Sequence, residues 1–142
     1  MTVKTDSSSF RDPSGFVFYH EGTCYRQINS TYKENYDYLL ESGLYEKLTN
    51  EGLLISHKKA DTGHLSSSNS HLTIQPEAIP FVSYPYEWCF PQFKNAALAT
   101  LDILKNALDH NMILKDANAY NIQFNNVQPL LIDTLSFEKY KE

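Results

Sequence analysis

The chain has 142 residues, the size of one ordinary domain, and carries a formal net charge of −5. This acidic balance excludes a general binder of nucleic acid or of anionic membranes, because such proteins present a basic face. The first residues lack the apolar core of a signal peptide, and no apolar run approaches the ~18 residues of a membrane helix. We therefore expect a cytoplasmic protein whose partners are neither nucleic acid nor membrane.

The N-terminal part reads as rich in strands. Residues 1–9 are polar, and we expect them to be disordered. Two aromatic and β-branched runs flank a glycine-containing turn and predict a hairpin, and two short amphipathic helices follow. The expected elements are strands at 16–19 and 24–28, helices at 32–40 and 44–48, and strands at 53–55, 71–74 and 81–84.

A polar, serine-rich run over residues 57–70 predicts a mobile loop inside this region. Residues 10–84 would therefore form a sheet-rich lobe. Residues 85–142 would follow with one long helix, which begins near Pro91. The helical spacing predicts that one face of this helix is buried on a core. That face comprises Phe93, Ala96, Ala97, Leu101, Ile103, Leu104, Ala107 and Leu108.

The densest chemical signal lies at residues 112–138. A short apolar run leads to Asp116, a polar loop leads to Asn121, and a hairpin of two short apolar strands ends on Asp133. A tight hairpin brings strand ends together, and carboxylate and amide oxygens suit a hard cation such as Mg²⁺. The alternative is ordinary turn chemistry, because Asp and Asn are common wherever strands end.

This order of elements, with Asp-x-x-x-x-Asn and a later strand-terminal Asp, resembles the protein-kinase-like fold and, within it, the aminoglycoside phosphotransferases. The resemblance implies an α+β fold in which Asp116 acts as the catalytic Asp, while Asn121 and Asp133 bind Mg²⁺ beside the phosphates of a nucleotide. Lys115 stands where that family has Arg, and it could neutralise a phosphate or simply be solvated.

The phosphate-gripping parts of that family are not recognisable. The turn at 20–23 has one glycine, and no Val-Ala-Ile-Lys motif occurs. Arg26 could be the substitute cation, paired with Glu34 or Glu41, or an ordinary solvated strand residue. Tyr86 and Trp88 would line an adenine-type cleft at the hinge between lobes, or serve as an apolar anchor.

Three phrases carry a narrower resemblance: SYPYEW at 83–88, LKDANAYNIQF at 114–124 and IDTLSFE at 132–138. They resemble the N-terminal kinase-like region of a bacterial group of SAM-dependent methyltransferases, some of nodulation type. The resemblance covers residues 10–142. It implies a module that is truncated before a C-terminal lobe. SAM would belong to a methyltransferase domain outside these residues, because no G-x-G occurs here.

We therefore expect a kinase-like module associated with a methyltransferase, which binds a small ligand or a partner and is not catalytically complete alone. One alternative is a small-molecule phosphotransferase that uses ATP and Mg²⁺. The other is a protein-interaction module that uses tyrosine-rich surface without binding a nucleotide. The expected partner is the methyltransferase domain or another chain. An isolated half-fold would expose the apolar face of its long helix, and we therefore expect self-association into a homo-oligomer.

Overall fold

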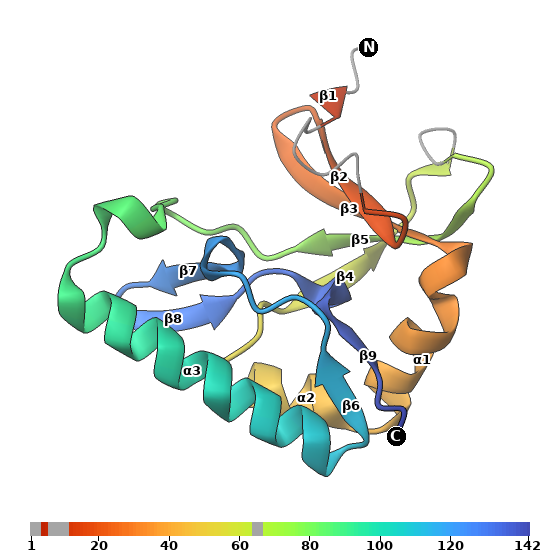
Figure 1. Cartoon of the computed structure of the whole chain (residues 1–142). Helices are drawn as coiled ribbons and strands as arrows, with labels where there is room; N and C mark the ends of the chain where they lie inside the picture. Colours follow the sequence, from red (N-terminus) through yellow and green to blue (C-terminus); the bar gives the residue numbers. More distant parts are fainter. Residues whose placement is uncertain (1–3, 6–11, 64–66) are drawn as a thin grey trace. The chain divides into compact units, whose positions relative to one another are not determined.

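The computed structural model describes residues 4–5, 12–63 and 67–142. The chain divides into two compact units (Figure 1). Unit 1 comprises Met1–Glu34 and Ser56–Ala78, and unit 2 comprises Asn35–Ile55 and Ile79–Glu142. The mixture of helices with antiparallel sheets confirms the predicted α+β class.

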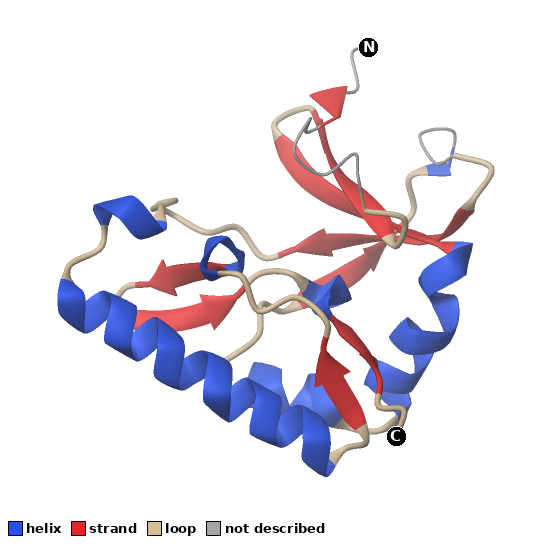
Figure 2. Ribbon diagram, in the orientation of Figure 1, coloured by secondary structure: helices blue, strands red, loops and turns tan. Residues whose placement is uncertain are grey.

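Unit 1 is built on one antiparallel sheet, whose strands are red in Figure 2 and labelled in Figure 1; their order is β1-β2-β3-β5-β4. The predicted hairpin is confirmed, with Phe18 opposite Tyr25 in the β2–β3 register. Glu21 and Gly22 at its turn both have positive φ, as a tight two-residue hairpin loop requires. The strands are β1 (Lys4–Thr5), β2 (Gly15–His20), β3 (Thr23–Asn29), β4 (His57–Ala60) and β5 (Ser70–Pro76).

Two sequence predictions for unit 1 need correction. The expected loop at 57–70 is wrong at its start, because β4 pairs with β5 in a regular register that sets Lys58 opposite Gln75. Exposed lysines protect a sheet edge from pairing with other chains, and a polar run can therefore be an edge strand. Lys4–Thr5, expected to be disordered, form β1. The rest of the expected disordered segment (1–3 and 6–9), and 64–66 of the loop, lie outside the described residues.

Unit 2 combines helices with two small antiparallel strand pairs, β6 with β9 and β7 with β8. Gly43, with a φ of 83°, separates the first two helices. The helices are α1 (Lys33–Glu41, which begins in unit 1), α2 (Leu44–Asn50) and α3 (Phe90–Asp109). The strands are β6 (Met112–Leu114), β7 (Ile122–Asn125), β8 (Gln128–Leu131) and β9 (Phe137–Lys139). The 3₁₀ turns are η1 (Ser30–Tyr32, in unit 1), η3 (Pro85–Glu87), η4 (Ala119–Asn121) and η5 (Thr134–Ser136).

Two predicted strands of unit 2 form no strand ladder. Leu54 makes an isolated parallel bridge to Leu131, with Ile55 N donating to Leu131 O at 2.9 Å. Residues 81–84 form no strand, because a side chain, Gln123, takes both backbone groups of Ser83. Apolar and aromatic runs of four residues do not reveal whether their backbone partner is a strand or a side chain.

The long helix α3 forms as predicted, but its buried face is rotated from the expected one. Ala96, Ala99, Ile103 and Ala107 face the core of unit 2, whereas Leu101 is 61% exposed. The small alanine side chains let the helix approach β6, β8 and α2 closely, whereas Leu98, Leu101 and Leu108 are exposed. Among the described residues, no helix, α3 included, has the length and apolar character needed to cross a membrane.

Candidate ligand and metal site

A hydrogen-bonded loop in unit 2 carries Asp116. Strand β6 pairs with β9, and Lys115 N donates to Ser136 O at 2.8 Å, which fixes the start of the loop. Asp116 Oδ1 then accepts from Asn118 N at 3.0 Å, and Asn118 Oδ1 accepts from Tyr120 N at 2.9 Å. These side-chain-to-backbone bonds are Asx turns, which short polar side chains form two residues ahead of their partner. The loop is therefore held by its own Asp and Asn side chains.

The structure brings Asp116 and Asn121 together. Asn121 Nδ2 donates to Asp116 Oδ2 at 3.1 Å. Because the amide nitrogen faces the carboxylate, the amide oxygen of Asn121 is directed away from it. An amide oriented in this way by a second residue is the arrangement expected of a metal ligand with an outer partner.

The β7–β8 hairpin sets Asp133 directly after the residue that pairs with Asn121. The register pairs Ile122 with Leu131, and Ile132 N donates to Asn121 O at 2.8 Å. The residue after Ile132 is Asp133, whose Oδ1 accepts from Leu135 N at 3.1 Å and begins η5. The hairpin thus sets the backbone of Asp133 next to that of Asn121, as the sequence predicted from strand ends alone.

Oxygen atoms are the donors that these residues could offer a cation. Among the described residues, no three or more His, Cys, Asp or Glu side chains gather where they could hold a metal ion. Asp116, Asn121 and Asp133 offer two carboxylates and one amide, all oxygen donors. Mg²⁺ is commonly bound through one or two carboxylates, with phosphates and water completing its shell.

The two aromatic residues predicted for a cleft lie in different environments. Trp88 is buried, its Nε1 donates to Ser83 Oγ at 3.0 Å, and its ring meets Phe93 and Phe124 edge to face. Its position favours the alternative interpretation, an apolar anchor. Tyr86 is 74% exposed.

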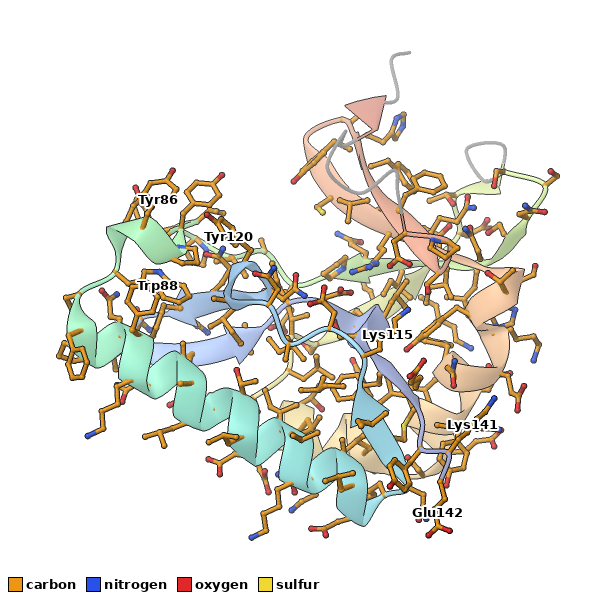
Figure 3. All side chains as sticks on the ribbon, in the orientation of Figure 1. Tyr86, Trp88, Lys115, Tyr120, Lys141 and Glu142 are labelled. Atoms are coloured by element: carbon orange, nitrogen blue, oxygen red, sulfur yellow. The ribbon has the colours of Figure 1, made fainter. Side chains whose placement is uncertain are left out.

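Three exposed tyrosines, Tyr84, Tyr86 and Tyr120, form a cluster near the Asp116 loop. Tyr84 and Tyr86 stack with ring centroids 5.6 Å apart and planes 6° apart. Tyr120, from the Asp116 loop, lies beside Tyr86 (Figure 3). Loss of solvation, followed by the charges of Glu87, Tyr84 and Tyr120, raises the pKa of the Tyr86 hydroxyl. The sequence analysis singled out Tyr86 alone, because the others come together only in the fold.

A buried amide positions this cluster. Gln123, on β7, is buried, and its side chain accepts from Ser83 N and donates to Ser83 O, both at 2.9 Å. Tyr84 N in turn donates to Glu87 Oε2 at 2.7 Å. Sequence reasoning passed over Gln123 as an ordinary strand residue. A glutamine between apolar strand residues Ile122 and Phe124 was the one signal available.

The remaining predicted site residues do not add to this geometry. Arg26 lies in unit 1, buried on β3, with Nη2 3.7 Å from Asp12 Oδ2. Asp12 also accepts from Ser14 N at 2.8 Å, so it ties the turn before β2 to that arginine. Glu34 is exposed in the first turn of α1, and Lys115 is exposed beside Asp116. A phosphate-neutralising role for Arg26 and Lys115, and the pairing of Glu34 with Arg26, stay predictions.

Comparison with known proteins gives one informative relative. The chain is 33% identical over 138 residues to "Nodulation protein NoeA" of Rhizobium meliloti (strain 1021). The aligned region covers 96% of this chain but only 29% of that protein. No protein-family model matches the chain. The chain therefore matches less than a third of the length of that relative.

Proposed function

We propose that this chain is a kinase-like module of a larger nodulation-type protein, and that it binds a nucleotide or another phosphate ligand with Mg²⁺. The observation that carries the proposal is the pairing of Asp116 with Asn121 beside the backbone of Asp133. The order of elements also supports it, because a long helix, a short strand and this loop precede a hairpin that ends on Asp, as in the kinase-like fold.

Each residue has a role in this proposal. Asn121 and Asp133 would hold the cation, which when bound would neutralise charge on the phosphates. Asp116 keeps Asn121 oriented and, as an exposed carboxylate, could orient or deprotonate an acceptor hydroxyl. Exposed Tyr86 and Tyr120 would offer ring faces to a planar part of the ligand.

The role in the whole protein is part of the same proposal. The relative bears the name of a nodulation protein, and this chain spans less than a third of its length. We propose that methyl transfer with SAM takes place in a further domain of such a protein. The module would then bind a ligand or a partner for that domain and would not be a complete enzyme.

Thermal melting with ATP and Mg²⁺ tests the proposal. A ligand present at 100 times its Kd stabilises the folded state by about 2.7 kcal/mol, which gives a readily measured rise in Tm. We expect the rise in the wild type, its loss in Asp133→Ala, and its retention in Asp102→Ala, which removes an exposed aspartate on α3. No rise in the wild type, or an equal rise in Asp133→Ala, contradicts a metal site.

The tyrosine cluster supports a second candidate, a protein-interaction module without a nucleotide. Tyrosine provides a large contact area at little cost in conformational entropy, and this cluster is held in place before any partner arrives. This candidate predicts that Tyr86→Ala weakens partner binding while ATP and Mg²⁺ leave the Tm unchanged. An active phosphotransferase, by contrast, requires ATP turnover that Arg26→Ala reduces.

A further inference from the structure

Helix α3 carries a second apolar surface beside the face that packs on the core of unit 2. Its members, spaced three or four residues apart, are Phe90, Phe93, Ala97, Leu101, Leu104 and Leu108, the outer stripe. Phe90 is 79% exposed and Leu101 61%. The stripe spans eighteen steps of the helix, or about 27 Å, and no charged residue interrupts it. An uninterrupted exposed stripe of this length marks an interaction surface.

Two lysines border the outer stripe. Lys94 and Lys105 are exposed and lie eleven residues apart, three helical turns or about 16 Å, on the same edge of the stripe. A partner that covers the stripe would bring its own edge against these ammonium groups. Carboxylates on that edge would be complementary, and further cations would repel.

The area of the outer stripe and the position of the two lysines argue against a second copy of the chain as the partner that covers the stripe. Large apolar side chains bury roughly 200 Å² each, so the partly exposed stripe offers on the order of 500 Å², and two stripes would bury about 1,000 Å². That area is the lower limit for a stable complex between separate chains. An antiparallel two-fold pair would also set each lysine edge against its own copy.

A polypeptide segment attached to the module is limited neither by the small contact area nor by repulsion between two lysine edges. A tethered segment has an effective concentration in the millimolar range, so a contact area of this size is enough to hold it in place. The relative aligns across 96% of this chain and carries more than twice as much sequence outside the aligned region. Such proteins therefore contain ample polypeptide to cover the stripe.

We propose that the outer stripe of α3 is the docking face for that further polypeptide. The occupant is an apolar helix face with carboxylates along the edge that meets Lys94 and Lys105. The inference is independent of the metal site, because α3 contributes no residue to it. A failed ATP test and a failed docking test are therefore separate results.

Hydroxyl-radical footprinting tests the proposal, because it reports the solvent exposure of individual side chains. The 142-residue chain is compared with a chimera in which it replaces the matching region of the Rhizobium meliloti relative. We expect oxidation of Phe90 and Leu101 to fall severalfold in the chimera. Val127, which is 85% exposed in the β7–β8 turn, should be unchanged, and fully buried Ile103 should stay protected in both. Equal oxidation of the stripe in both proteins overturns the proposal.

Two further measurements cover the other outcomes. If Ile103 becomes reactive, the chimera is misfolded, and the aligned helix of the intact relative is footprinted instead; exposure of its outer face overturns the proposal. Leu101→Lys should lower the Tm of the longer protein by several degrees and barely change that of the 142-residue chain, with Val127→Lys silent in both. If the protection seen in the longer protein disappears on dilution, and that longer protein sediments as a dimer, the stripe is assigned to a second copy and the proposal is also overturned.

Discussion

Replacing Gln123 with alanine should loosen the segment that carries the tyrosine cluster. The buried Gln123 side chain makes two hydrogen bonds of 2.9 Å to the backbone of Ser83. Each such bond contributes about 0.5–1.5 kcal/mol to the free energy of unfolding. Leaving the half-buried backbone N–H and C=O of Ser83 without a partner adds a desolvation cost to this. We expect Gln123→Ala to lower the free energy of unfolding by about 2–3 kcal/mol, a fall in Tm of roughly 10 °C for a chain of this size.

The assay follows urea unfolding together with the fluorescence of Trp88, the single tryptophan. Trp88 Nε1 donates to Ser83 Oγ, so release of Ser83 should shift the native emission spectrum toward that of a solvated indole. Gln128→Ala, at an exposed position of β8, is the matched control. A loss below about 0.5 kcal/mol, the usual range for surface changes, or an unchanged native spectrum would refute the reasoning.

Three further predictions concern other parts of the chain. Burial lowers the pKa of His57 from 6.5 to about 4, so the unfolded state binds the proton more readily than the folded state. The contribution of this group to the free energy of unfolding should therefore be full above pH 6.5 and fall by up to about 3 kcal/mol as the pH drops to 4. Urea titrations should show a smaller fall in His57→Gln, and parallel curves would contradict this. The buried hydroxyl of Ser136 has no hydrogen-bond partner among the described residues, so Ser136→Ala should raise the unfolding free energy by about 1 kcal/mol; a loss of that size would reveal a partner. The isolated chain should self-associate weakly through the outer stripe, and Leu101→Lys should abolish this in sedimentation velocity; a wild-type monomer at high concentration would count against it.

The sequence was informative where one local rule determines the structure. The β2–β3 hairpin follows from a positive-φ turn between two β-prone runs, and the start of α3 follows from Pro91. The neighbourhood of Asn121 and Asp133 follows from a tight hairpin, whose strand ends must meet. Each of these features depends on residues close together in the chain.

Prediction from the sequence failed where a residue far away in the chain determines the local structure. Apolar spacing shows that α3 has a buried side, but only the neighbouring strands determine that alanines rather than leucines face the core. The hydrogen bond between Gln123 and Ser83 joins residues forty positions apart, and no local sequence pattern predicts it. Strand β4 is polar and forms only because it pairs with β5, so its sequence alone predicted a loop.

The central claim is that Asp116, Asn121 and Asp133 form one Mg²⁺–phosphate site, and paramagnetic NMR with Mn²⁺ and ATP tests it most directly. Mn²⁺ takes the same oxygen ligands as Mg²⁺ and broadens resonances close to it. The account predicts that the side-chain amide of Asn121 and the backbone amides of Asp116 and Asp133 broaden first, only when ATP is present, and that excess Mg²⁺ restores them. Uniform broadening at scattered surface carboxylates, or none at Asn121, would contradict it.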